Sequence, residues 1–326
     1  MALDTQVELA PAGRPGSVGM PTLHKAIFVG LLLLGLAAPY MVYPIFVMKV
    51  LCFALFACAF NLLLGFGGLL SFGHAAYFGG ASYISAHAAK VWGLTPELAI
   101  LSGTLAAAVL GLAIGSLAIR RQGIYFAMVT LAFAQMVFFF SVQAPFTGGE
   151  DGIQSVPRGH LFGMISMASD RNLYFFVLAV VFAGLLVIYR IVHSPFGQVL
   201  KAIRENEPRM VSLGYRTNRY KLAVFVLSAA LAGMAGATKA IVFQLASLTD
   251  VYWTMSGEVV LMTLLGGMGT VFGPILGAAV IVTMQNYLAT FGDWVTIGQG
   301  IIFVVAVMLF REGIVGVVAR IIKRPL

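Results

Sequence analysis

Long apolar runs separated by short polar connections make up most of the chain. The run "AIFVGLLLLGLAAPYMVY" (26–43) carries no charge over nearly the length that crosses a bilayer, about 20 residues. These runs are continuous, whereas membrane barrels alternate in polarity over segments of about 10 residues. The pattern therefore predicts helical spans over the ranges 26–43, 45–64, 69–89, 95–119, 123–142, 172–192, 222–243, 256–270, 273–291 and 295–311.

The composition points to the same class of protein. Hydrophobic residues make up 60% of the chain and charged residues only 10%, against about 25% charged in soluble domains. A soluble fold has too little interior to bury this much apolar surface, so the chain must be surrounded by lipid. In lipid, the backbone N–H and C=O groups must form hydrogen bonds with one another. We predict an all-α polytopic membrane protein with about ten transmembrane helices, some of them broken at glycine.

The basic residues set the expected orientation. With the N-terminus inside, 15 of the 20 Lys and Arg residues fall on the cytoplasmic side. Only Lys90, Arg158 and Arg171 face outward, while Lys49 and Lys239 lie near outer span ends, where we expect them to snorkel. The formal charge of +8 is therefore read as a topology signal and not as a nucleic-acid surface. Both termini are expected in the cytoplasm.

This orientation divides the chain into parts. We expect a cytoplasmic tail at 1–25, a membrane domain at 26–311 and a cytoplasmic tail at 312–326. Within the membrane domain, the long polar connection 143–171 lies outside and the connection 193–221 lies inside. The bases spaced among aliphatics in the last tail suit a short helix along the membrane surface, and an ordinary solvated end is the alternative.

Catalytic and metal-binding patterns are absent from the sequence. It has no phosphate-cradling G-x-x-x-x-G-K-[ST] motif, and Cys52 and Cys58 fit neither a zinc nor a redox spacing, so we read them as buried thiols. Glu97 and Glu258 lie near span ends, no acid falls at a span centre, and His74 is the one deep titratable side chain. We therefore expect no catalytic residue, no metal and no cofactor in this chain.

Two glycine-rich segments interrupt the apolar pattern, "GFGGLLSFGHAAYFGG" (65–80) and "GGMGTVFGPILGA" (266–278). Such glycines serve either close helix packing or a broken helix that lines a polar path, and two segments in separate halves hint at an internal repeat. A break in the second segment would involve Gly266, Gly267, Gly269, Gly273 and Pro274. For His74, a buried imidazole satisfied by a neighbouring carbonyl is the alternative to a place on the path.

A dense polar segment, "SPFGQVLKAIRENEPRMVSLGYRTNRYK" (194–221), stands between apolar runs. Its apolar and charged residues are interleaved, Pro208 favours two short helices over one, and Gly214 is placed to end the second. A compact helical element of this kind can sit in a partner's groove and move with it. The alternative is a basic loop that only sets topology.

Several stretches resemble a known family when taken together and in order. They are "GFGGLLSFGHAAYFGGASY", "RRQGIYFAMVTLAFAQMV", "TGGEDGI", "SPFGQVLKAIRENEPRMVSLGY", "LAVFVLSAALAGMAGA" and "LLGGMGTVFGPILGA". The chain resembles the permease subunits of branched-chain amino acid ABC importers, of the LivM type. The resemblance implies a bacterial inner-membrane complex with a second permease of the LivH type, two cytosolic ATPases that use the ATP, and a periplasmic binding protein.

The resemblance also implies roles for residues. The polar segment would be the ATPase-coupling element, with Leu200, Ala202, Ile203, Arg204, Glu205, Asn206, Glu207 and Gly214. The translocation path, for branched-chain amino acids or a related small polar solute, would use Ser71, Phe72, Gly73, His74, Tyr77 and Thr130. Relatives that carry urea, short amides or organic acids leave the solute open. A stand-alone channel or secondary transporter is the alternative, and a membrane-embedded enzyme ranks third.

Overall fold

The computed structural model describes residues 22–288, together with 298, 300, 301, 304, 308 and 313–316. The expected N-terminal tail, most of the expected span 295–311 and most of the C-terminal tail lie outside these residues. Helices dominate the described part, which confirms the all-α polytopic class. The helical elements are α1 (Thr22–Met41), α2 (Pro44–Asn61), η1 (Leu62–Phe66), α3 (His74–Lys90), α4 (Pro96–Ala118), α5 (Ile124–Gln143), η2 (Pro145–Thr147), η3 (Gly149–Asp151), α6 (Asp170–Val192), α7 (Pro195–Glu205), α8 (Glu207–Ser212), α9 (Thr217–Phe243), η4 (Leu248–Asp250), α10 (Trp253–Gly266) and α11 (Gly273–Leu288).

Strands are confined to two short antiparallel pairs in the described residues. β1 (Ile153–Gln154) pairs with β4 (Leu245–Ala246), with Ile153 opposite Ala246. β2 (His160–Leu161) pairs with β3 (Ile165–Ser166). The first pair joins the connection 143–171 to the chain that follows α9.

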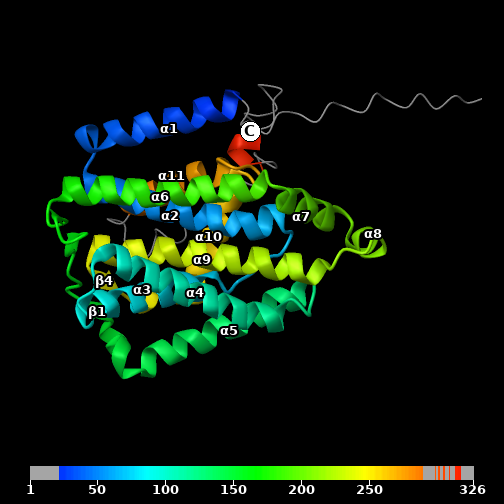
Figure 1. The fold of residues 1–326 in the computed structure, drawn as a ribbon, viewed down its shortest axis with the longest axis horizontal. Helices are drawn as coiled ribbons and strands as arrows, with labels where there is room; N and C mark the ends of the chain where they lie inside the picture. The colour runs from blue at the N-terminus through cyan, green and yellow to red at the C-terminus, as the bar shows by residue number, and fades with distance from the viewer. Residues whose placement is uncertain are drawn as a thin grey trace, which may run out of the picture.

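The long helices lie side by side in one bundle (Figure 1). The helix α9 runs through its middle and packs on α2, α3 and α4, while α1 and α5 form opposite flanks. The short helices α7 and α8 project beyond one end of the bundle, and β1 and β4 lie at the other end. The two long polar connections therefore lie at opposite ends of the molecule.

Six helices in the described part are long and apolar enough to cross a membrane: α1, α2 with η1, α4, α5, α6 and α9. Three further helices are shorter, with 17 residues in α3, 14 in α10 and 16 in α11. The predicted span 69–89 is wrong at its start because the helix begins only at His74. The predicted span 256–270 is wrong at its end because α10 stops at Gly266.

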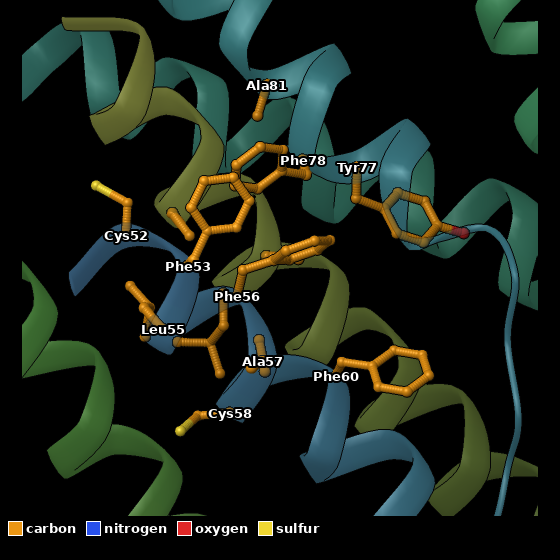
Figure 2. Close-up of a cluster of buried hydrophobic side chains, with 14 of the residues drawn as sticks. Cys52, Phe53, Leu55, Phe56, Ala57, Cys58, Phe60, Tyr77, Phe78 and Ala81 are labelled. Atoms are coloured by element: carbon orange, nitrogen blue, oxygen red, sulfur yellow. The ribbon is translucent and has the colours of Figure 1, made fainter. Parts of the chain in front are cut away.

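An aromatic cluster between α2 and α3 forms part of the core (Figure 2). The ring centroids of Phe56 and Phe78 are 4.4 Å apart, and those of Phe53 and Phe78 are 5.7 Å apart. Cys52 and Cys58 are free thiols buried on α2. Burial of these large side chains at native packing density fixes the relative positions of α2 and α3.

The two flanking helices expose their apolar side chains. Leu34 on α1 is 69% exposed and Phe139 on α5 is 60% exposed. An apolar surface of this extent is stable only against lipid or a partner protein. The exposed apolar surface of the bundle is therefore that of a membrane protein.

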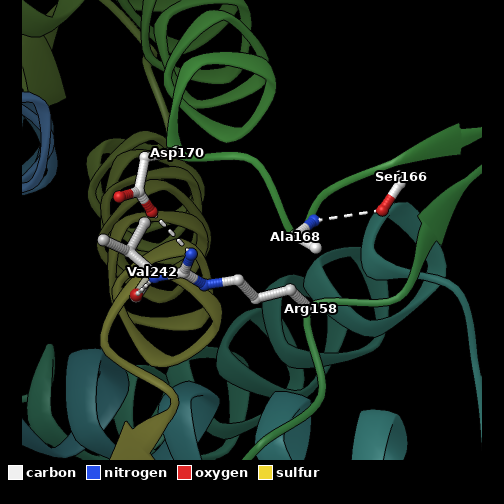
Figure 3. A network of polar contacts seen from close by, with 5 residues as sticks. All are labelled: Arg158, Ser166, Ala168, Asp170 and Val242. Atoms are coloured by element: carbon white, nitrogen blue, oxygen red, sulfur yellow. Dashed lines mark hydrogen bonds and ion pairs between the residues drawn. The ribbon is translucent and has the colours of Figure 1, made fainter.

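The connection between α5 and α6 is anchored by Arg158 (Figure 3). Its Nη1 donates to Asp170 Oδ1 at 2.7 Å, and its Nη2 donates to the carbonyl of Val242 at 3.1 Å. Arg158 thus ties this connection to the start of α6 and the end of α9. The helix α6 begins at Asp170 and α5 ends at Gln143, so the connection between these two helices is slightly shorter than the predicted range 143–171.

Close contact between α9 and α3 depends on a glycine. A Cβ at Gly236 would lie 1.9 Å from the carbonyl oxygen of Phe78, which is backbone and has little room to move. We predict that Gly236→Ala lowers the free energy of unfolding by about 1–3 kcal/mol, the usual cost of overpacking. Thermal unfolding of the protein in detergent measures this change. The control is Gly30→Ala on α1, where nothing lies within 4 Å of the added carbon. Equal melting temperatures for the two variants would contradict the close packing.

Candidate translocation and coupling sites

The residues predicted to line a path gather where the chain enters α3. Residues 67–73 are not helical, and two side chains satisfy their backbone. Thr130 on α5 accepts a hydrogen bond from the N–H of Phe72 at 3.1 Å through Oγ1. Ser71 accepts one from the N–H of Gly73, also at 3.1 Å, through Oγ. The structure therefore brings Ser71, Phe72, Gly73 and Thr130 together.

His74 is the first residue of α3 and is fully buried. Its Nε2 lies 2.9 Å from Ser228 Oγ on α9, and Ser228 in turn donates to the carbonyl of Ala59 on α2 at 2.6 Å. Because the single hydroxyl proton of Ser228 goes to Ala59, the imidazole is the donor in the first bond. Nε2 of His74 is thus satisfied by a serine that relays to a carbonyl, whereas the buried Nδ1 has no hydrogen-bond partner among the described residues. The rings of Phe60 and Tyr77 meet it edge-on, at 4.9 and 5.6 Å between centroids.

The first turns of α3 and α10 meet inside the bundle. The N–H of Ala75 donates to Ser256 Oγ at 2.9 Å, and both residues are fully buried. The helix α3 follows the non-helical segment 67–73, and α10 follows a connection that contains β4 and η4. Of the six predicted path residues, only Phe72 is partly exposed. A solute could pass here only if these helices separate.

The helical structure is interrupted again between α10 and α11. A side chain at the end of α2 forms hydrogen bonds with the backbone of this turn. Gly266 ends α10, Gly273 and Pro274 open α11, and Gly267 and Gly269 have φ angles of +121° and +76°. The amide of Asn61 donates to the carbonyl of Thr270 at 2.7 Å and accepts from the N–H of Gly269 at 3.0 Å. The sequence analysis missed Asn61, although a lone amide in the apolar run "CAFNLLLG" was a usable signal.

The polar segment folds as two short helices. Asn206 separates them, and its Oδ1 accepts from the N–H of Arg209 at 3.0 Å as an N-cap. Pro208 lies in the first turn of α8, where its missing N–H costs nothing. Gly214 follows α8 with a φ of +85°. Residues 217–221, expected in the loop, instead form the start of α9.

Arg204 connects α7 to both glycine-rich segments. Its Nη1 donates to the carbonyl of Gly65, and its side chain packs against Gly68 and near Gly269. Gly65 belongs to η1, the π-helical turn that continues α2. The projecting helix pair is thereby hydrogen-bonded to η1 and lies close to the turn between α10 and α11.

The structure divides the predicted coupling residues into two groups. Leu200 and Ile203 are buried within the chain, Ala202 is partly buried, and Glu207 binds Lys221 at 2.6 Å, so these hold α7 and α8 in place. Glu205 remains exposed. The exposed part of the helix pair also includes Arg209, Val211 and Leu213, which together with Glu205 we call the α7–α8 surface.

A cavity of about 350 Å³, lined by both charged and apolar side chains, lies at the β4 end of the bundle. Its wall comes from α2, α9, α10, α11 and the segment before α10, and is formed by Lys49, Phe53, Lys239, Phe243, Leu245, Ser247, Thr249, Asp250, Met255, Glu258 and Gln285. The sequence analysis did not predict this cavity.

Lys239 corrects an expectation from the sequence. It does not snorkel outward but forms an ion pair with Asp250, whose side chain is 2% exposed. Asp250 packs against Gly79 in the second turn of α3, so the bundle does contain a buried acid. Lys49 also lines the cavity. The hydropathy pattern hid the pair because both residues lie near the end of an apolar run.

The chain is similar to known permeases over most of its length. A family model described as "Branched-chain amino acid transport system / permease component" matches residues 44–310. The high-affinity branched-chain amino acid transport system permease protein LivM of Escherichia coli K12 is 28% identical over 92% of this chain and 77% of its own. LivM of Salmonella typhimurium shows the same identity and coverage.

A more distant similarity covers half of the chain. The ribose import permease protein RbsC of Bacillus subtilis is 27% identical over 51% of each chain. No solved structure matches the chain.

Asn61 should be needed for folding. In Asn61→Leu, the carbonyl of Thr270 and the N–H of Gly269, both partly buried, lose their partners, and each unsatisfied group costs up to about 3 kcal/mol. We predict a loss of monodisperse protein in size-exclusion chromatography and a lower melting temperature. The control is Asn286→Leu, at an exposed position on α11. A stable Asn61→Leu variant would show that the break does not depend on this side chain.

Proposed function

The chain belongs to the family of branched-chain amino acid transport permease components, and on that basis we propose that it forms a translocation path together with a second, related permease of the LivH type. Two cytosolic ABC ATPases drive the complex, and a periplasmic protein delivers the solute. This chain carries no phosphate-cradling motif, so ATP hydrolysis is assigned to the ATPases and not to this chain.

The attachment of Arg204 to the helix breaks is the observation that carries this proposal. A loop that served only to fix topology would need bases but no ordered contact with the membrane core. Here α7 bonds to Gly65 beside the segment 67–73, and the α7–α8 surface stays free for a partner. A partner that moves this surface therefore also displaces η1, which leads into the segment before α3 and lies beside the turn between α10 and α11.

The α7–α8 surface has the composition of a docking site. Val211 is 56% exposed and Leu213 is 67% exposed, and the charged residues Glu205 and Arg209 lie on the same pair of helices. Exposed apolar residues rimmed by charges mark interaction sites. We assign the ATPases to this end, which places it in the cytoplasm, and the binding protein to the β1–β4 end.

The proposed solute is a branched-chain amino acid or a related small polar molecule. The family description and the two LivM relatives name branched-chain amino acids, whereas RbsC is named for ribose.

Uptake into vesicles tests the proposed function directly. Membranes with all components should accumulate L-leucine only when ATP is present and the second permease and ATPases are included. ATP-independent uptake by this chain alone would contradict the proposal and favour a stand-alone channel or secondary transporter.

Cysteine labelling in intact cells tests the orientation. Ser155 and Glu205 are exposed at opposite ends of the bundle, and both native thiols are buried. We predict that a membrane-impermeant maleimide labels Ser155→Cys and does not label Glu205→Cys until the cells are opened. Labelling of Glu205→Cys in intact cells would reverse the proposed topology.

Variants on α7 and α8 test the coupling role. Glu205→Arg reverses a charge on the α7–α8 surface, and Gly214→Val forces a β-branched residue into a positive φ. Removing one member of a buried charge pair at an interface weakens the binding free energy by about 2–5 kcal/mol. Removing a solvated charge weakens it by less than about 1 kcal/mol. We therefore expect a stable permease that no longer retains its ATPases in affinity purification.

The control for the coupling variants is Glu150→Arg, which makes the same charge change at the opposite end of the molecule. It should retain the ATPases and support uptake at the parental rate. If Glu205→Arg and Gly214→Val behave like this control, the segment acts only as a topology signal.

A further inference from the structure

Four arginines lie around the turn between α4 and α5. This turn is at the end of the bundle from which α7 and α8 project (Figure 1). All four side chains are exposed, and none belongs to the three ion pairs of the described chain. They are Arg120 and Arg121 in the turn itself, and Arg216 and Arg219 at the start of α9.

The packing of α4 on α9 brings these two pairs together. The helices run antiparallel, because Gly103 packs on Ala237 and Gly115 packs on Leu222. The last turn of α4 therefore lies level with the first turns of α9. Arg219 lies three residues before Leu222, so it is on the face of α9 that meets α4.

The acid that contacts this turn already has partners. Gln122 Nε2 donates to Glu207 Oε2 at 3.2 Å, and Lys221 binds Glu207 Oε1 at 2.6 Å. These contacts fix the turn against α8 and α9. Because Glu207 is paired with Lys221, it leaves the charge of the four arginines uncompensated. A group of basic residues at the end of membrane helices attracts anions.

The surface next to the arginines is apolar. Both α4 and α5 are long and apolar enough to cross a membrane, so their exposed side chains lie beside hydrocarbon. Those nearest the turn are Leu117, Ile124, Tyr125 and Met128, and Ile124 is 72% exposed. Tyrosine and arginine side chains favour the level of the lipid headgroups. A ligand that matches this surface therefore needs an anionic head and a hydrocarbon part.

We propose that the turn between α4 and α5 binds an anionic phospholipid. The four guanidinium groups hold its phosphate, because a guanidinium presents a planar pair of donors that matches phosphate oxygens. The acyl chains lie along Leu117 and Ile124. The orientation proposed above assigns this lipid to the cytoplasmic leaflet.

The α7–α8 surface differs from the arginine site in composition. It combines Glu205 and Arg209, which have opposite charges, with two exposed aliphatic residues, and this mixture suits a protein partner. The arginine site carries one sign of charge and borders helices that cross the membrane. We therefore assign the ATPases to α7 and α8, and the lipid to the turn. A bound headgroup would also brace α8, since Gln122 connects the turn to Glu207.

Quenching by brominated lipids tests the inference in the complete importer. A fluorophore on Ser116→Cys reports the lipid beside the last turn of α4, and labelling is specific because both native thiols are buried. The importer is placed in phosphatidylcholine nanodiscs that contain a minor fraction of brominated phosphatidylglycerol or, in a parallel sample, of brominated phosphatidylcholine. The two quenching efficiencies give the preference for the anionic lipid.

A basic residue near an anionic surface raises the affinity about fivefold, so we expect a preference of roughly tenfold or more at this position. High salt should weaken the preference. The same fluorophore on Leu98→Cys, exposed at the opposite end of α4, should show none.

Three double variants accompany the parent. Arg120→Gln with Arg121→Gln should lower the preference by roughly tenfold or more, whereas Arg120→Lys with Arg121→Lys should keep most of it. The matched control is Lys25→Gln with Arg190→Gln, which removes two exposed charges on α1 and α6 at the same end of the bundle. It should keep the parental preference.

The inference is overturned if both lipids quench the parent equally, or if the glutamine variant of the turn keeps the parental preference. An equal loss in the control would also overturn it, because the preference would then belong to the whole end of the molecule. Loss of the ATPases from the glutamine variant of the turn in affinity purification would instead assign the arginines to ATPase docking. ATP-driven uptake is measured separately, and its absence in the parent would refute the proposed function without changing the lipid result.

Discussion

Inside a bilayer, every backbone N–H and C=O must find its partner within the protein, and this constraint decides how the chain can interrupt its helices. The interruptions before α3 and between α10 and α11 each receive hydrogen bonds from a polar side chain of another helix. Thr130 forms a hydrogen bond with the segment before α3, and Asn61 with the turn between α10 and α11. Arg204 donates to the carbonyl of Gly65. Without these side chains the interruptions would leave backbone groups unsatisfied inside the protein. With them, the segment before α3 and the turn between α10 and α11 are non-helical but ordered. A partner that moves α7 and α8 can displace them.

The same side chains connect the ends of the molecule. Arg204 lies on the projecting helix α7, its bond reaches η1, and η1 directly follows Asn61, which holds the turn before α11. Where α3 and α10 begin, their first turns meet through the hydrogen bond between Ala75 and Ser256. In the coupling that we propose, force applied at α7 and α8 is transmitted through η1 toward the first turns of α3 and α10. The charged cavity lies beyond that place, next to η4 and Gly79.

The apolar runs were enough to predict the class of fold and most helix positions, because helix length and hydropathy are local properties. They could not locate the start of α3, since Leu69 and Leu70 continue the apolar run while the chain there is not helical. They also missed Asn61, whose partners lie 208 and 209 residues away. Lys239 was misplaced because hydropathy reports how close a residue is to a span end but not which way its side chain turns. Glu207 was expected to face a partner, and only the packing of α8 on α9 shows that Lys221 already holds it.

The central claim is that the projecting helices and the turn between α10 and α11 move as one unit. Spin labels at Ser212 on α8 and Met268 in the turn, both exposed, report this in the complete importer. Pulsed electron paramagnetic resonance in the nucleotide-free and ATP-bound states should give an unchanged distance between these two labels. The distance from Ser212 to a third label at Ser155 should change between the same states. A change between Ser212 and Met268 as large as that between Ser212 and Ser155 would contradict the claim.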